Sequence, residues 1–118
     1  MAKWSKKMDL EYYEIKEHAD DIYESRHCRR KYTLEDTFYS FLGEYEMRDQ
    51  HTSLERTSIY IAFATLLIDR KKRFDFMVSE TKELLKKANL KDIRLELGEE
   101  NYLIFEKDLE EVKKNMKI

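Results

Sequence analysis

Residues 59–68 constrain this chain more than any other stretch, because every position except Thr65 carries an apolar or aromatic side chain. A helix that is hydrophobic on nearly all sides must be surrounded by other helices or by lipid. The run is shorter than the roughly 20 residues that cross a bilayer, and Glu55 and Asp69 place charges near its two ends. It therefore predicts the buried central helix of a bundle, spanning about residues 52–70.

The start of this central helix has the sequence of a capping box. Thr52 is placed to accept a hydrogen bond from the first turn, and Glu55, three residues later, is placed to accept one from the cap N–H. We expect the helix to hold its neighbours in register through five core side chains: Ile59, Ile61, Phe63, Leu66 and Leu67.

The composition is that of one folded helical domain. The 118 residues are 42% hydrophobic and 41% charged, with two Gly and no Pro, so few positions force the chain out of a helix. We predict an all-α, compact single-domain bundle of five or six helices, with residues 1–8 as a loosely ordered extension. The lone Cys28 fits a reducing compartment, and no apolar stretch of signal-peptide length begins the chain, so we expect a cytoplasmic location.

Two amphipathic helices are predicted before the central one. The first spans about residues 9–25 with Asp9 as its cap, and a polar link at residues 26–32 leads to the second. This second helix, about residues 33–49, begins at Thr33 with Asp36 three residues later. Apolar side chains recur at helical spacing at Tyr12, Ile15, Ala19 and Ile22 in the first helix, and at Leu34, Phe38, Phe41, Leu42 and Tyr45 in the second.

The chain after residue 73 predicts a helix over residues 74–89, with Asn89 as a left-handed stop. Residues 90–105 leave two alternatives, because Ile93, Leu95 and Leu97 also alternate as in a hairpin. We prefer a short helix ended by Gly98, since a lone hairpin is marginal in water. A final helix over residues 99–117 is expected to bury Leu103 or Ile104, together with Phe105, Leu109, Val112 and Met116.

The chain lacks the residue patterns of an enzyme or a metal site. Glu24 and His27 have the Glu-x-x-His spacing of di-iron bundles, but such a site needs a second copy of the motif. Cys28 follows His27 directly, and adjacent residues rarely orient a thiol against its base. Gly43 and Gly98 are isolated, so no phosphate-binding loop is predicted. We therefore expect neither catalysis nor a metal or cofactor.

Acidic side chains are concentrated on the first predicted helix. Residues 9–24 contain seven Asp or Glu and one Lys, whereas basic residues gather at 26–31 and 70–73. Such segregation steers charged partners, although a merely solvated helix face is the simpler interpretation. If the helix does bind a partner, the candidate contact residues are Tyr12 or Tyr13 as anchors, with Glu14, Glu17, Asp20, Asp21 and Glu24.

The order of these features resembles a known family. Four segments carry the resemblance, which covers most of the chain: LEYYEIKEHADDIYES, SIYIAFATLLIDRKK, FDFMVSETKELL and LGEENYLIFEKDLEEVKKNM. Together they resemble the small all-helical immunity proteins of bacterial polymorphic-toxin systems, in particular the immunity family numbered three. The resemblance implies a protein that is encoded beside a toxin, often a nuclease, and that protects the producing cell by binding the toxin domain.

Two other classes of function compete with this interpretation. One is a structural or regulatory module that forms a homodimer through the aromatic residues of the second helix. The other is a DNA-binding regulator that uses the basic residues 26–31, whose binding would weaken steeply with salt.

Overall fold

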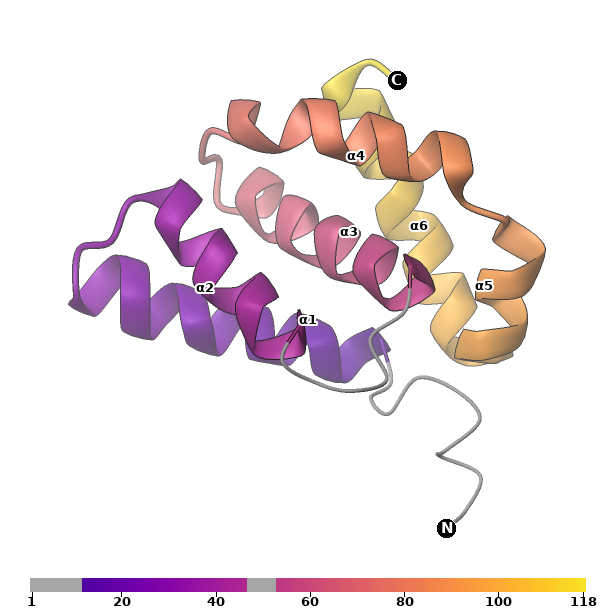
Figure 1. Ribbon diagram of the computed structural model, residues 1–118, viewed down its shortest axis with the longest axis horizontal. Coiled ribbons are helices and arrows are strands. Elements are labelled where there is room, and N and C mark those ends of the chain that lie inside the picture. Colours follow the sequence, from indigo (N-terminus) through magenta and orange to yellow (C-terminus); the bar gives the residue numbers. More distant parts are fainter. Residues whose placement is uncertain (1–11, 47–52) are drawn as a thin grey trace, which may run out of the picture.

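The computed structural model describes residues 12–46 and 53–118, and within these ranges the chain is helical with no strand (Figure 1). The predicted all-helical bundle is thus confirmed. Its elements are α1 (Tyr12–Ile22), the π-helix η2 (Tyr23–Arg29), α2 (Leu34–Glu46), α3 (Ser53–Asp69), α4 (Asp75–Lys87), α5 (Leu90–Leu97) and α6 (Glu99–Met116). None of the described helices combines the length and the apolar character needed to cross a membrane.

The central helix predicted from the apolar run is α3. It packs against α1, α2, α4 and α6, and Figure 1 shows it in the middle of the bundle, with α1 below it and α4 above. Residues 57–65 are all buried, as is Leu67, whereas Leu66 is only partly buried. Thr65, the polar exception in the run, donates its hydroxyl hydrogen to the Ile61 carbonyl at 2.8 Å. That local bond lets a polar side chain occupy the core.

The first predicted helix buries the side chains expected of it, but it does not end at Ser25. Tyr12, Ile15, Ala19 and Ile22 are buried, and the chain then continues as η2 to Arg29, through part of the predicted link. No Gly or Pro interrupts this segment, and the Tyr23 and His27 rings contact each other at a centroid distance of 5.2 Å. The expected Asp9 cap and the extension at residues 1–8 lie outside the described residues.

The second helix begins as predicted. The Thr33 hydroxyl oxygen accepts a hydrogen bond from the Asp36 N–H at 3.0 Å, and α2 starts at the next residue, Leu34. Phe38, Phe41 and Leu42 are buried. Three predictions lie outside what the structure describes: the capping box of Thr52 and Glu55, the burial of the Tyr45 side chain, and the end of the second helix at residue 49.

The segment around Asn89 corrects one prediction and resolves another. Asn89 is not a left-handed stop: its φ of −103° and ψ of 105° are extended, and it caps α5 instead. Its side-chain oxygen accepts hydrogen bonds from the N–H groups of Lys91 at 3.0 Å and Asp92 at 3.3 Å. The preferred short helix is confirmed and the hairpin alternative is wrong. Gly98 ends α5 at a φ of 83°, a conformation that other residues rarely adopt.

The last helix buries a different residue in its first turns from the two that we expected. Leu103 is 59% exposed and Ile104 is 39% exposed, whereas Tyr102 is buried. Successive residues are rotated by roughly 100° around a helix, so burial of Tyr102 turns the next two side chains outward. The other expected positions, Phe105, Leu109, Val112 and Met116, are buried, and Asp108 is buried among them.

Candidate functional site

The outer side of α1 brings together most of the residues predicted to bind a partner. Its inner side is fixed by the buried stripe that faces α3 and α6, so the intervening positions face solvent. Tyr13 is 46% exposed. We call the carboxylates of this side, together with Glu24 in the first turn of η2, the acidic face. Glu17, Asp20, Asp21 and Glu24 are exposed, while Glu14 is partly buried.

Tyr12 does not belong to this surface. Its side chain is 0% exposed, and its ring packs edge-on against Phe105 with centroids 5.4 Å apart. The prediction that Tyr12 could anchor a partner is therefore wrong, because the same helical spacing that exposes Tyr13 turns Tyr12 into the core. Tyr13 remains as the aromatic candidate.

Tyr12 instead takes part in a polar group that the sequence analysis missed. Its hydroxyl donates to the Asp108 carboxylate at 2.8 Å, and the Lys16 ammonium lies 2.8 Å from the same oxygen. We call these three residues the buried cluster. Burial raises the pKa of Tyr12 well above its usual value, and the charge of Asp108 and the hydrogen bond raise it further. The available signal was Asp108 itself, a charged residue within the apolar stripe of α6.

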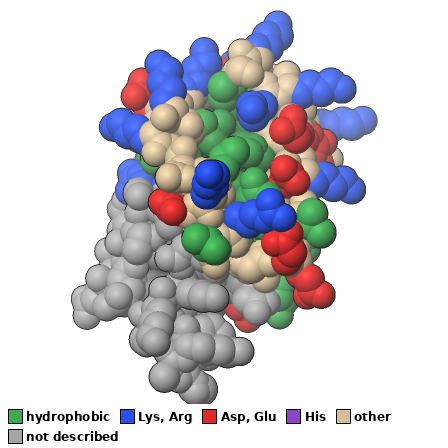
Figure 2. All heavy atoms as spheres, turned by 90° about the vertical axis from the view of Figure 1, so that its right-hand side faces the viewer, with side chains coloured by type: hydrophobic (Ala, Val, Ile, Leu, Met, Phe, Trp, Pro, Cys, Tyr) green, Lys and Arg blue, Asp and Glu red, His purple; other side chains and the backbone are tan. Residues whose placement is uncertain are grey.

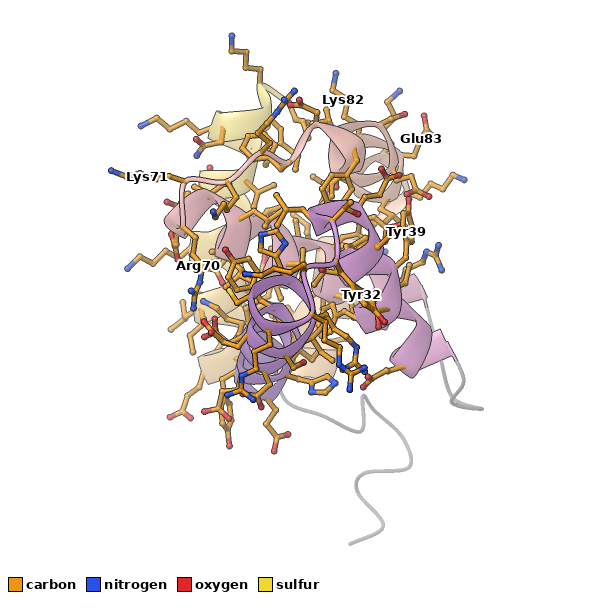
Figure 3. All side chains as sticks on the ribbon, turned by 90° about the vertical axis from the view of Figure 1, so that its left-hand side faces the viewer. Tyr32, Tyr39, Arg70, Lys71, Lys82 and Glu83 are labelled. Carbon is orange, nitrogen blue, oxygen red and sulfur yellow. The ribbon has the colours of Figure 1, made fainter. Side chains whose placement is uncertain are left out.

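Arg70 joins the far end of the acidic face to the end of α3. Its guanidinium bonds Asp20 at 2.9 Å and Glu24 at 3.2 Å, and it lies over the Tyr23 ring at 4.6 Å. Figure 3 shows Arg70 at the edge of this end of the bundle. We call Arg70, Asp20 and Glu24 the Arg70 cluster. The hydrogen bond to Asp20 is the main cause of the raised pKa of Arg70, which keeps its charge.

Glu17 and Asp21 differ from these paired carboxylates. Both are exposed, and neither makes an ion pair within the described part of the chain. A small pocket of about 150 Å³ lies beside Glu17 between α1 and α3; three acidic residues, Glu17, Asp20 and Asp69, line it together with one basic residue, Lys16. The sequence analysis did not include Asp69, because only the packing of α3 against α1 brings it to this side. The arrangement suits a basic side chain entering from a partner.

The basic segment after α1 is partly engaged within the fold. The Arg26 guanidinium bonds the Ser40 hydroxyl at 3.4 Å and lies 3.9 Å from a Glu44 oxygen. His27 Nδ1 lies 2.7 Å from the Tyr32 carbonyl oxygen. In the described ranges, no cluster of three or more His, Cys, Asp or Glu has an arrangement that would hold a metal ion.

The aromatic residues of α2 are also largely committed to the core. Phe38 is buried against Tyr60 and Phe63, at centroid distances of 4.8 and 5.1 Å. Tyr39 is exposed, but its hydroxyl donates to Glu80 on α4 at 3.2 Å, and Tyr60 donates to the same oxygen at 2.9 Å. Burial is the main cause of the raised pKa of Tyr60. Figure 3 labels Tyr39 on this side, and it is the exposed aromatic among the α2 side chains that the structure describes, since Phe38 and Phe41 are buried.

Comparisons of the chain with protein-family models, with curated proteins and with solved structures found no match. The candidate site is therefore defined by its own geometry.

Proposed function

We propose that this protein binds a cognate bacterial toxin domain, a nuclease in the simplest case, and neutralises it by direct contact through the acidic face. The observation that carries the proposal is the pair of exposed carboxylates of Glu17 and Asp21, which make no ion pair with any residue that the structure describes. They lie beside exposed Tyr13 on a helix whose opposite side is buried. The resemblance of the sequence to immunity proteins supplies the class of partner.

Electrostatics favours this type of partner. A nuclease must hold a polyanion, so its substrate-binding cleft is basic, and an acidic surface is drawn toward the same field. The pocket lined by Glu17, Asp20 and Asp69 offers a place for a Lys or Arg side chain of the toxin. Tyr13 adds apolar area and a hydroxyl at the margin, as aromatic residues do in protein interfaces.

The Arg70 cluster prepares this surface for binding. Arg70 contacts Asp20 and Glu24 at 2.9 and 3.2 Å, and these exposed ion pairs reduce by a small amount the side-chain freedom that is lost when a partner docks. Glu17 and Asp21 then supply charge that the fold has not neutralised. On the acidic face, Asp20 and Glu24 are thus paired with Arg70, and Glu17 and Asp21 are exposed to an approaching partner.

The experiment uses the C-terminal domain of the toxin encoded beside this gene and measures association by stopped-flow or surface plasmon resonance. The variant Glu17→Lys/Asp21→Lys reverses two exposed charges and should slow association by about tenfold or more at low salt. The control Glu106→Lys/Glu110→Lys makes the same change at the same spacing on exposed positions of α6. It should associate within about threefold of the wild-type rate.

Two negative results would have different meanings. Absence of a complex at micromolar concentration would contradict toxin binding as the function. A complex that forms equally fast with both double variants would reject the acidic face and leave another surface responsible.

A further inference from the structure

A second surface of opposite charge lies at the C-terminal ends of α4 and α6. It is a groove of about 480 Å³ that includes the start of α5 in its lining, within the range of roughly 300–1,000 Å³ typical of ligand-sized sites. None of its lining residues belongs to α1, so it is distinct from the acidic face. Four lysines line it: Lys82, Lys86, Lys113 and Lys117.

The packing of the helices explains why a groove is present. Both α4 and α6 pack against α3, but they contact each other only weakly, so the space between their C-terminal ends is not filled. Leu109 forms a buried floor, and Leu90 and Ile118 are 43% and 41% exposed at the margins. Figure 2 shows hydrophobic side chains in a strip, with Lys and Arg side chains above and around it and Asp and Glu side chains along one side.

The charge of the groove is unbalanced. No Asp or Glu lines it, and within the described residues Lys82, Lys113 and Lys117 make no ion pair. Lys86 has only an exposed contact with Glu83 at 3.9 Å, which contributes little. An occupant that combines apolar groups with several negative charges would therefore complement both features.

We propose that this groove, which we call the lysine groove, binds an acidic amphipathic helix of a partner protein. Lys82 and Lys86 are four residues apart on α4, and side chains at this spacing follow one side of a helix. On the other margin, Lys113 lies in the last turn of α6 and Lys117 caps this helix in a left-handed conformation. All four lysines line the groove, so each margin carries two ammonium groups. An apolar helical stripe flanked by carboxylates matches two charged margins and an apolar floor.

A single-chain amphiphile fits less well. A fatty acid carries one carboxylate, which would leave the ammonium groups of at least one margin unpaired. A helix with Glu on both sides of its apolar stripe reaches both pairs at once. The distribution of charge along two separate elements is therefore the observation that favours a protein partner.

The test uses a fluorescein-labelled synthetic peptide of about 15 residues, with Leu at i, i+3, i+4 and i+7 and Glu at the flanking positions. Fluorescence anisotropy should show binding to the full chain that weakens as NaCl is raised. The variant Lys86→Glu/Lys113→Glu should weaken binding by about tenfold or more. A peptide with Lys in place of Glu should not bind, and one with Ser in place of Leu should bind at least about tenfold more weakly.

A matched control separates the groove from net charge. Lys72→Glu/Lys107→Glu changes the charge equally at exposed positions outside the groove, and it should bind the acidic peptide within about threefold of wild type. All substituted lysines are exposed or at the groove margin, so circular dichroism should show unchanged helicity.

Three results would overturn the proposal. The first is no anisotropy change with the acidic peptide at about 100 µM protein, and the second is equal weakening in both double variants. The third is binding of vesicles of phosphatidylglycerol in the absence of peptide binding, which would assign the lysine groove to a lipid surface. These measurements use a synthetic peptide and no toxin, so they test the lysine groove independently of whether the acidic face binds a toxin.

Discussion

The buried cluster and the Arg70 cluster attach α1, and η2 that continues it, to neighbouring parts of the bundle with similar chemistry but in different surroundings. In the buried cluster, Asp108 has a side chain that is 8% exposed, and it bonds Tyr12 and Lys16. In the Arg70 cluster, the Asp20 and Glu24 side chains are about half exposed, at 52% and 51%. The Lys16 side chain is 34% exposed, close to the 37% of Arg70, so the clusters differ in their carboxylates and in the Tyr12 hydroxyl. Water reaches both carboxylates of the Arg70 cluster, whereas it is largely excluded from the Tyr12–Asp108 bond.

This difference separates a structural role from a surface role. Removing Asp108 would leave the Tyr12 hydroxyl without water to replace it, whereas the partly exposed Lys16 can be solvated. The Tyr12–Asp108 bond therefore fixes how α1 lies against α6. The Arg70 cluster loses little when it is broken, because its members can be solvated. The exposed side of α1 is thus free to present charge to a partner while the buried side holds the helix in place.

The largest effect is expected from Asp108→Ala. The Tyr12 hydroxyl, at 0% exposure, would lose its acceptor, and the free energy of unfolding should fall by about 2–3 kcal/mol. Urea unfolding followed by circular dichroism measures this, with exposed Glu110→Ala as a control that should change stability by less than about 0.5 kcal/mol. If Asp108→Ala were as stable as Glu110→Ala, the buried cluster would contribute no more to stability than an exposed carboxylate, and its proposed structural role would be wrong.

The next effect concerns alkaline pH. Because the pKa of Tyr12 is raised in the fold, the folded protein keeps this proton above pH 10 while the unfolded chain releases it. Stability should therefore fall as pH rises above about 10, by up to about 1.4 kcal/mol per pH unit for this group. Tyr12→Phe should reduce that slope in unfolding measurements between pH 8 and 11. Exposed Tyr32→Phe should leave it unchanged, and an identical slope in all three proteins would argue against a buried phenol.

The smallest effect is expected from Arg70→Met. Exposed ion pairs contribute about 0–1 kcal/mol, and the contact with the Tyr23 ring adds a similar amount at most. The thermal midpoint should change little, and the electrostatic part of the difference should disappear near 1 M NaCl. If the free energy of unfolding of Arg70→Met were lower than that of the wild type by more than about 2 kcal/mol, and remained so at high salt, the Arg70 cluster would have the same structural role as the buried cluster.

Local patterns predicted much of this fold. The run at residues 59–68 required a surrounded helix, Thr33 capped α2 as its position indicated, and Gly98 ended α5 because it tolerates positive φ. The rotation of α1 followed from its apolar spacing, which also placed Glu17 and Asp21 on the outside. Residue type did not predict the role of a residue that suits two roles. Tyr suits both an interface and a core, and Asn suits both the end and the start of a helix, so the predictions for Tyr12 and Asn89 were wrong.

The sequence by itself thus determined most of the helical segments and which side of α1 is acidic, because helix propensity and hydrophobic spacing act over a few residues, but it did not predict that η2 continues the first helix to Arg29. Only the tertiary structure decided that Asp108 accepts from Tyr12, 96 positions away, and that Arg70 bridges Asp20 and Glu24. It also decided that α4 and α6 leave the lysine groove between them. These features depend on the positions of whole helices relative to one another, which are set by the packing of many side chains at once and not by any local pattern.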